Sequence, residues 1–245
     1  MTPETTRDAL LGGRIPYVQP AHGYRVALEA PMLARFAIEG RTRPFGHVLD
    51  LGSGPGAIGL MLTATRWATR GTAVEVDPHH AALARENALA NQVPLEVVQA
   101  DVTNPPAIDQ AELVIANPPW FETDEGGVAP EPSRAAARAF VHGALSSFIR
   151  SGRRLLAPRG RLVITMPSSR TTELFETLAS VGLHPKRIRF VHPRPSREAQ
   201  VVFVEAKPAK PGGLVIERPW YVRGLEGQDY IPETADALQG RWPTP

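Results

Sequence analysis

A glycine-rich turn directly after a short apolar run constrains the fold of this chain more than any other feature. The run Val48-Leu49-Asp50-Leu51 is typical of a buried strand, and the turn Gly52-Ser53-Gly54-Pro55-Gly56 leads from it into a helix that should end near Thr63. Glycines at alternate positions allow the backbone to approach a ligand at the N-terminus of that helix. This arrangement predicts the first strand and helix of a nucleotide-binding sheet.

The stretch from His47 to Ile164 continues the pattern, because short β-branched runs alternate with helical segments. Further strands are expected at 72–76, 95–98, 113–116 and 161–165, and further helices at 78–91, 133–156 and 171–181. Two last runs, 186–191 and 200–205, predict a hairpin. We therefore predict an α/β, Rossmann-like fold with a mostly parallel seven-stranded sheet, an antiparallel last strand and helices on both faces.

The flanks of this region divide the chain into three parts. We expect an extension at 1–44 with a strand at 15–18 and a helix at 27–38, one main domain at 45–206, and a tail at 207–245 that packs on it as an extended arm. The chain lacks cysteine, which excludes disulfides, thiolate nucleophiles and Cys-ligated zinc, and no metal is expected. Neither an apolar leader nor a run of 18 apolar residues occurs, so we expect a soluble, cytoplasmic protein without a membrane segment.

The positive charge is concentrated in one part of the sequence. The net charge is only +2, yet the segment from Arg150 to Arg223 holds 15 Lys and Arg against 5 Asp and Glu. Such asymmetry is expected of a protein that turns one surface toward a polyanion. The alternative is a solvated surface that happens to be rich in arginine.

The turn alone does not choose a cofactor, because the segment from Gly54 to Gly59 also fits the dinucleotide pattern G-x-G-x-x-G. Asp50 favours one choice, because its carboxylate ends the strand where it would face an ammonium group rather than a pyrophosphate. S-adenosyl-L-methionine (SAM) carries that ammonium and NAD does not. Glu75 and Asp101 follow the next two strands, where they could accept hydrogen bonds from the ribose hydroxyls and the adenine amino group. Each of these three carboxylates could instead be an acidic loop residue or a helix cap. For Asp77, which precedes Pro78, we expect only the role of helix cap.

The segment Asn117-Pro118-Pro119-Trp120 closes the fourth strand and suits chemistry on a planar nitrogen. Its prolines fix the backbone, so that the Asn117 side chain and the Pro118 carbonyl point in set directions. Both could accept hydrogen bonds from one exocyclic amino group and localise its lone pair toward an electrophile. Trp120 could stack on the ring that carries the nitrogen. A strand followed by a proline-rich turn is the alternative.

Taken in order, these motifs resemble the class I SAM-dependent methyltransferases that act on amino groups, and most closely the bacterial tRNA1(Val) adenine-37 N6-methyltransferase family. The similarity extends to Gly13-Arg14-Ile15 and to the helix end from Asn87 to Asn91. The resemblance implies SAM as cofactor and adenine N6 in tRNA as the acceptor. The expected catalytic residues are Asn117, Pro118, Pro119 and Trp120, and the expected cofactor-binding residues are Asp50, Gly52, Gly54, Gly56, Glu75, Asp101, Val102 and Asn117.

Substrate contacts are expected where basic and aromatic residues flank this site. Arg194 and Arg197 lie in the loop of the predicted last hairpin, which in this fold is on the same edge as the site. The full set of expected substrate-binding residues is Tyr24, Arg25, Phe121, Arg194 and Arg197, with Arg134 and Arg138 next. We expect tRNA or another structured RNA as partner, bound by a monomer or a homodimer.

Three other functions remain open from the sequence. A protein glutamine N5-methyltransferase would use the same Asn117 motif on an amide, without needing the basic segment. A small-molecule N-methyltransferase would be insensitive to salt. A module that only binds SAM is disfavoured, because every residue expected to touch cofactor and amino group is present.

Overall fold

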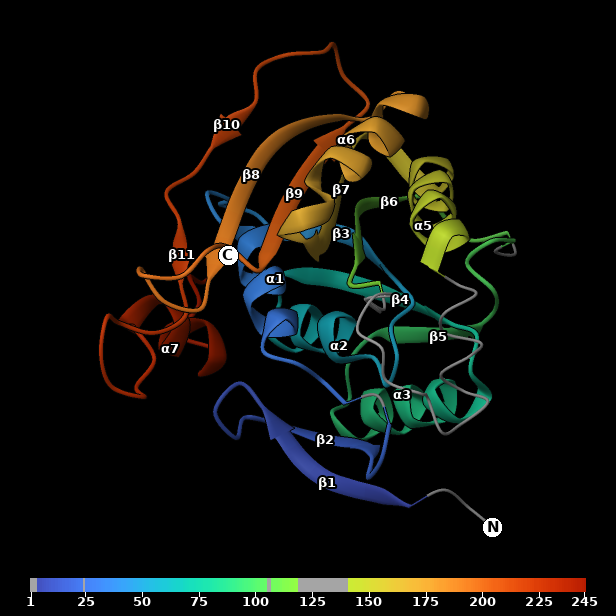
Figure 1. Ribbon diagram of the computed structural model, residues 1–245. Coiled ribbons are helices and arrows are strands. Elements are labelled where there is room, and N and C mark those ends of the chain that lie inside the picture. Colours follow the sequence, from blue (N-terminus) through green and yellow to red (C-terminus); the bar gives the residue numbers. More distant parts are fainter. Residues whose placement is uncertain (1–3, 24, 105–106, 119–140) are drawn as a thin grey trace, which may run out of the picture.

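The computed structural model describes residues 4–23, 25–104, 107–118 and 141–245 of the chain. A twisted central sheet has helices on both faces, and a separate hairpin lies at one end of the molecule (Figure 1). Within these described residues, no helix combines the length and apolar character needed to cross a membrane.

The central sheet has the predicted Rossmann-like architecture. Its strands are β3 (Phe45–Leu51), β4 (Ala68–Glu75), β5 (Leu95–Gln99), β6 (Ala111–Ala116), β7 (Leu156–Pro167), β8 (His184–His192) and β9 (Val201–Lys207). They are ordered β8-β9-β7-β6-β3-β4-β5, and β9 runs antiparallel to both of its neighbours. The mostly parallel sheet with one antiparallel strand is therefore confirmed.

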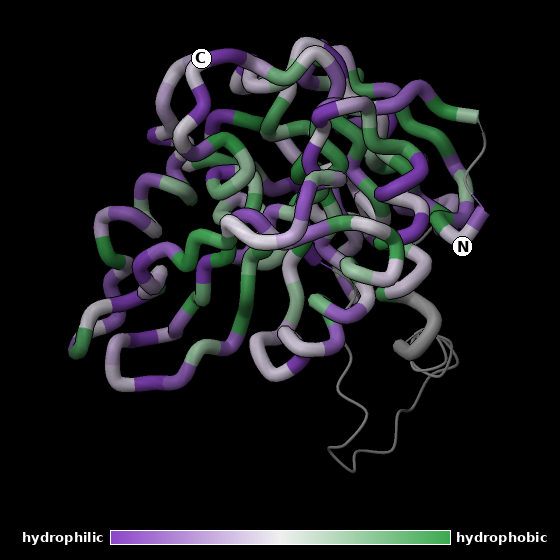
Figure 2. The backbone as a smooth tube through the Cα atoms, turned by 90° about the horizontal axis from the view of Figure 1, so that it is seen from above, coloured by the Kyte–Doolittle hydropathy of each residue, from purple (hydrophilic) through white to green (hydrophobic). Residues whose placement is uncertain are grey.

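Helices cover the two faces because successive strand residues point to opposite sides. One face packs against α1 (Glu29–Ile38), α2 (Ala57–Ala64) and α3 (Pro78–Ala90). The other packs against α5 (Val141–Leu155) and α6 (Thr171–Ser180), and a short 3₁₀ helix, Ser168–Arg170, leads into α6. Figure 2 shows hydrophobic residues along many inner segments of the chain and hydrophilic residues in many of the outer ones. As predicted, Asp77 caps α3, where its Oδ1 accepts a hydrogen bond from the His80 N–H at 2.9 Å.

The N-terminal extension forms a hairpin that the sequence showed only in part. Its strands β1 (Thr5–Leu10) and β2 (Ile15–Pro20) pair antiparallel as a sheet of their own. We expected a strand at 15–18 but none at Thr5–Leu10, because most side chains of β1 are exposed and show no apolar alternation. An ion pair of 3.0 Å between Arg25 and Asp8 ties the hairpin to the segment that follows it.

The C-terminal tail is more ordered than an extended arm. Its short strands β10 (Val215–Ile216) and β11 (Trp220–Tyr221) both pair parallel with β8, and α7 (Pro232–Leu238) follows. These two strands extend the predicted seven-stranded sheet to nine. Trp220 is fully buried, and its indole N–H donates to the Thr234 hydroxyl at 2.9 Å.

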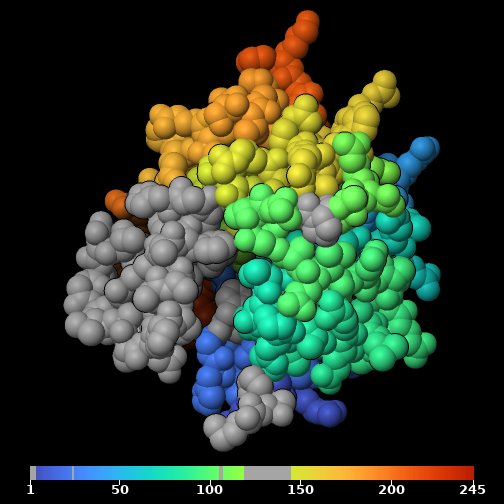
Figure 3. Space-filling view, turned by 90° about the vertical axis from the view of Figure 1, so that its right-hand side faces the viewer, coloured from blue at the N-terminus to red at the C-terminus, as the bar shows by residue number. Residues whose placement is uncertain are grey.

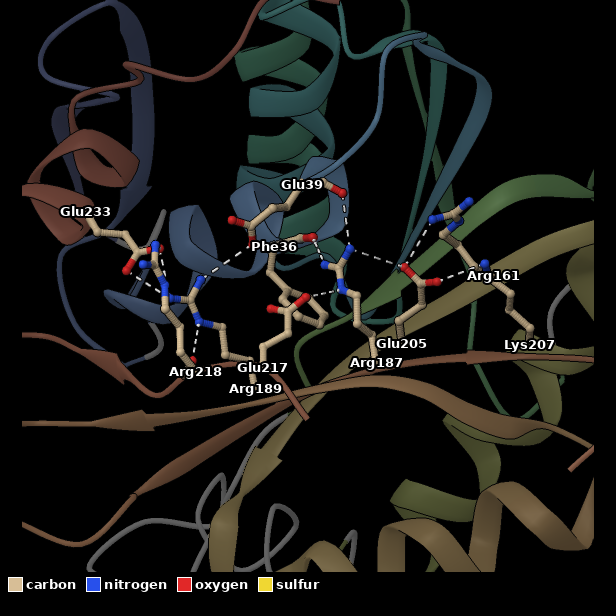
Figure 4. A network of polar contacts seen from close by, with 10 residues as sticks. All are labelled: Phe36, Glu39, Arg161, Arg187, Arg189, Glu205, Lys207, Glu217, Arg218 and Glu233. Carbon is tan, nitrogen blue, oxygen red and sulfur yellow. Dashed lines mark hydrogen bonds and ion pairs between the residues drawn. The ribbon is translucent and has the colours of Figure 1, made fainter. Parts of the chain in front are cut away.

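A buried network of charges joins this tail to the sheet (Figure 4). Arg189 on β8 is 2% exposed, and its guanidinium donates two hydrogen bonds of 2.8 Å to the Glu233 carboxylate on α7. Nearby, Glu205 pairs with Arg161 at 3.1 Å and with Lys207 at 3.1 Å. Burial works to raise the pKa of Glu205, but the surrounding cations outweigh it and hold that pKa below its usual value. The tail is thus anchored by side chains that the sequence alone does not bring together.

Candidate active site

The carboxyl ends of β3, β4 and β6 meet at one edge of the sheet. Leu51 is in register with Val74 of β4 and with Ala116 of β6. The residues that end these strands or follow them therefore lie side by side, as in other open α/β sheets. A small pocket opens at this edge, and its lining residues are Tyr17, Val26, Ala30, Asp50, Gly52, Ser53, Ala57, Ile58 and Asn117.

The glycine turn has the backbone geometry that requires glycine. Gly52, Gly54 and Gly56 have φ values of +67°, +54° and +85°, in the left-handed region. A Cβ atom on Gly52 would lie 2.8 Å from the ring of Phe148, and one on Gly56 would lie 3.2 Å from the Ala84 Cβ. The turn can therefore follow its tight path only because these side chains are absent.

Asp50 is the buried carboxylate of the pocket. It is 2% exposed, and its Oδ2 accepts a hydrogen bond of 2.9 Å from the Gly59 N–H at the start of α2. Burial raises the pKa of Asp50 to about 7, and the neighbouring charge of Glu75 adds to the rise, whereas the Gly59 hydrogen bond opposes it. Burial makes the charged form of this carboxylate unfavourable, so a cationic group of a ligand in the pocket would stabilise it.

Glu75 ends β4 and fixes the glycine turn. Its side chain is largely buried, its Oε2 accepts from the Gly54 N–H at 2.7 Å, and its Oε1 accepts from the Asp77 N–H at 2.8 Å. Each carboxylate oxygen has a second lone pair, so the same orientation could receive two hydroxyls. Glu75 thus supports the loop and remains suited to the ribose role that we predicted.

The end of β5 supplies the next part of the site. Asp101 is exposed, and its Oδ1 accepts from the Thr103 N–H at 2.8 Å, whereas Val102 is 5% exposed. The carbonyl of Val102 accepts a hydrogen bond from the Ser151 hydroxyl on α5. Val76 lies beside this segment, because Glu75 pairs with Gln99 at the strand ends.

Val76 is a candidate site residue that sequence reasoning did not single out. Its side chain is 52% exposed although it is β-branched and directly follows a buried strand. An exposed apolar side chain directly after Glu75 could cover the face of a flat ring. The sequence feature that could have identified Val76 was its position directly after Glu75.

Asn117 reaches the same pocket as Asp50 from the end of β6. It is partly exposed, and Pro118 after it is buried. The remaining predicted residues of this region, Tyr24, Pro119, Trp120, Phe121, Arg134 and Arg138, lie outside the described residues. Their predicted roles stay predictions.

The predicted substrate arginines that the structure describes are placed at two separate points. Arg25 pairs with Asp8 and also donates to the Pro20 carbonyl at 2.9 Å. Arg194 donates to the carbonyls of Gly224 at 3.0 Å and Gly227 at 2.6 Å, so it holds the loop of the C-terminal tail. Arg197 is exposed in the loop between β8 and β9. Because β8 runs in the same direction as β7, this loop lies at the Asn117 edge of the sheet.

Some arginines of the basic segment, residues 150–223, point into the protein interior rather than toward solvent. Arg161, Arg187 and Arg189 all pair with glutamates in the network of Figure 4, and Arg189 also lies 4.3 Å from the centre of the Trp220 ring. Their charge is therefore partly neutralised by Glu39, Glu205, Glu217 and Glu233. The excess of Lys and Arg counted in the sequence is therefore larger than the positive charge that lies on the surface, where a polyanion could contact it.

Two walls of the pocket also come from elements that sequence reasoning did not assign to it. Tyr17 on β2 is 1% exposed, and Val26 precedes α1. Both are far from the glycine turn in sequence, so no local pattern connects them with it. Among the described residues, no group of three or more His, Asp or Glu side chains is arranged to hold a metal ion.

Comparison with known families gives a consistent match. Residues 34–181 match the model of the methyltransferase small domain. A tRNA1(Val) (adenine(37)-N6)-methyltransferase from Aeromonas hydrophila is 35% identical over 163 residues, which span 64% of this chain and 67% of that protein. The protein of the same name from Porphyromonas gingivalis is 31% identical over 170 residues, or 66% of each chain, and thus just under two thirds of its length.

Solved structures show the same fold. A predicted O-methyltransferase from Agrobacterium tumefaciens superposes with a TM-score of 0.66 at 24% identity, over 87% of this chain and 96% of that one. TrmN from Thermus thermophilus superposes with a TM-score of 0.55 at 23% identity, over 73% of this chain and 47% of that one. These similarities concern the arrangement of the sheet and its helices.

Proposed function

Since the chain belongs to the methyltransferase small domain family, we propose that it transfers a methyl group from SAM to the N6 amino group of an adenine in tRNA. The observation that carries this proposal is the shared pocket of Asp50 and Asn117, a buried carboxylate and a planar amide at one sheet edge. The names of the relatives from Aeromonas hydrophila and Porphyromonas gingivalis support the choice of tRNA adenine.

The residues of the pocket fit SAM by their chemistry. Asp50 is buried, faces the pocket and carries a raised pKa, so a ligand ammonium would compensate its desolvation. Glu75 is held at the next strand end by two backbone N–H groups, in an orientation that suits two ribose hydroxyls. Val76 and Asp101 would receive the face and the amino group of the adenine. When bound, SAM would supply an electrophilic methyl group from its sulfonium, which is left as a neutral thioether, while the methylated nitrogen gives up one proton to solvent.

Asn117 would orient the acceptor nitrogen. Its side-chain oxygen and the Pro118 carbonyl would accept hydrogen bonds from the two N–H groups of the substrate, which directs the nitrogen lone pair away from the ring system. This chain would supply orientation and two acceptors rather than a strong base. Orientation alone is able to contribute several kcal/mol to such a transfer, and about 7–11 kcal/mol in well-oriented intramolecular reactions.

A tRNA acceptor requires that the adenine leaves its stack, at a cost of about a few kcal/mol. Phosphates beside the flipped base would need cations near the Asn117 edge of the sheet. Arg197 is exposed in the β8–β9 loop at this edge, and Arg194 braces that loop against the C-terminal tail. We propose that the β8–β9 loop and the loop of the C-terminal tail that Arg194 holds face the RNA. Arg25 would lie on the opposite side of the site.

The second candidate is methylation of a protein glutamine. The observation that favours it is the pairing of Arg161, Arg187 and Arg189 with buried or partly buried glutamates, which reduces the charge available to RNA. A side-chain amide has the same two N–H donors as an adenine amino group, so Asn117 would act on either.

The proposed domain organisation follows the predicted boundaries. Residues 45–206 would form the catalytic domain, 1–44 would complete the cofactor pocket through the hairpin, and 207–245 would brace the sheet edge. Action on tRNA would place the protein in the cytoplasm, as a monomer or a homodimer.

Transfer of label from tritiated SAM tests the proposed acceptor class. Total RNA from a strain that lacks this gene and a protein extract of that strain are incubated in parallel with the wild-type chain and with Asn117→Ala. We expect label in tRNA that the variant fails to transfer. Label in protein alone would support the glutamine candidate, and label in neither fraction would refute both.

A further inference from the structure

The N-terminal hairpin forms one wall of the cofactor pocket without belonging to the central sheet. Its strands β1 and β2 pair only as a two-stranded sheet among the described residues. Tyr17 of β2 nevertheless lines the pocket together with Asp50 and Asn117. The position of this wall must therefore be set by side chains that link β2 to the domain.

Asn87 on α3 makes the most extensive of these links. Its Oδ1 accepts from the Val18 N–H at 2.7 Å, and its Nδ2 donates to the Val18 carbonyl at 2.9 Å. The same Nδ2 donates to the Pro55 carbonyl of the glycine turn at 3.0 Å. Asn87 is 1% exposed. One buried amide thus holds the pocket wall and the cofactor turn at a fixed separation.

The spacing of α3 matches the strand that it binds. Asn91 lies one helical turn after Asn87 on the same face, and its Nδ2 donates to the Pro16 carbonyl at 2.8 Å. Four helical residues rise about 6 Å, and two strand residues span about 6.7 Å, so the two asparagines meet the outward-facing groups of Val18 and Pro16. Asn91 ties the hairpin to α3, whereas Asn87 also ties it to the glycine turn.

The same face of α3 packs closely against the turn. Ala84, one turn before Asn87, is fully buried, and its Cβ lies 3.2 Å from where a Cβ on Gly56 would be. Figure 3 shows the N-terminal segment, in blue, lying beside the surface formed by residues 75–100, in cyan to green. Helix α3 therefore contacts both the hairpin and the glycine turn, and it can set the distance between them.

We propose that Asn87 is a positioning residue for SAM: it sets the gap between the Tyr17 wall and the glycine turn, and so controls cofactor affinity. The inference rests on the proposed function, because it takes SAM as the ligand of this pocket. It predicts an effect on SAM binding that the loss of a hairpin contact alone would not produce.

Asn87→Ala and Asn91→Ala form a matched pair for the test. Both remove hydrogen bonds from α3 to β2, but only Asn87→Ala releases the glycine turn. Calorimetry gives the Kd for SAM, and steady-state kinetics give KM for SAM and kcat. We expect Kd and KM for SAM to rise about tenfold or more in Asn87→Ala, with kcat at saturating SAM within about threefold of the wild type. Asn91→Ala should change the Kd by less than about threefold.

The outcomes separate the inference from the function on which it rests. A wild-type chain that does not bind SAM would refute the proposed function and this inference with it. SAM binding by the wild type, with an unchanged Kd in Asn87→Ala or with equal changes in both variants, would overturn the inference alone. If Asn87→Ala does not fold, Asn87→Asp replaces it, because a carboxylate keeps the acceptor for the Val18 N–H and loses both donated bonds. A raised Kd in Asn87→Asp would support the inference, and an unchanged one would overturn it.

Discussion

The buried carboxylate of Asp50 predicts a specific pH dependence of SAM binding. Its pKa is raised to about 7 in the ligand-free chain, mainly because burial penalises the charged form. A ligand ammonium beside Asp50 favours that charged form and lowers its pKa in the complex. Binding of SAM should therefore release a proton from Asp50 below pH 7, and affinity should fall as the pH is lowered.

The size of this effect follows from the pKa. With a pKa of about 7, Asp50 is about half ionised at pH 7.0 and about 3% ionised at pH 5.5. If only the ionised form binds SAM well, the affinity rises about 16-fold between pH 5.5 and pH 7.0, which is about 1.6 kcal/mol. The SAM amino group stays protonated over this window, since such groups titrate near about 7.7–8.0.

Calorimetric titrations with SAM at pH 5.5, 6.0, 6.5 and 7.0 measure this slope. Repeating them in buffers of different ionisation enthalpy counts the released proton, which should approach one per SAM at pH 5.5. Asp50→Asn is the matched variant, because its amide oxygen keeps the acceptor for the Gly59 N–H and cannot ionise. A flat profile in the wild type, or the same slope in Asp50→Asn, would refute the assignment of Asp50 to the ammonium.

Three further predictions concern the rest of the fold and the site. Arg189→Ala leaves partly buried glutamates without their cation, so it should lower the free energy of unfolding by about 3 kcal/mol. In thermal melts, the Tm should fall by about 6–12 °C. A change in the free energy of unfolding below about 1 kcal/mol would contradict the role of the network. Asn117→Ala should lower the single-turnover rate at saturating SAM about 100-fold or more, and a rate within about threefold of the wild type would exclude Asn117 from the transfer step. Gly52→Ala should abolish SAM binding, because its Cβ would lie 2.8 Å from the Phe148 ring at a φ of +67°. Gly13→Ala is its control, since Gly13 also has a positive φ but has no atom within 4 Å of an added Cβ.

The parts of the fold that the sequence predicts are those with local patterns. The glycine turn, the alternation of strands and helices, and the Asp77-Pro78 cap each fix a backbone geometry within a few residues. Their combination was sufficient for the α/β class, the strand pairing at the last hairpin and the family resemblance. Asp50, Glu75 and Asn117 could be grouped in advance, because parallel strands bring their carboxyl ends to one edge.

The parts that the sequence does not predict depend on contacts between distant segments. Strand β1 has mostly exposed side chains, so it forms through pairing with β2 rather than through an apolar pattern. The ordered tail depends on Arg189 meeting Glu233, 44 residues later. Tyr17 lines the pocket from a strand that is linked to the domain through hydrogen bonds between Val18 and Asn87, which are 69 residues apart. Counting charges also overestimated the basic surface, since residue type does not reveal which arginines are buried.

The identity of the methylated nucleoside tests the central claim most directly. A tRNA fraction from a strain that lacks this gene is incubated with SAM and the wild-type chain, digested to nucleosides and analysed by mass spectrometry against standards. We predict N6-methyladenosine, formed only with SAM and absent with Asn117→Ala. A methyl group on a ring nitrogen of adenine, on guanine or on a ribose hydroxyl would contradict transfer to the exocyclic amino group that Asn117 is proposed to hold.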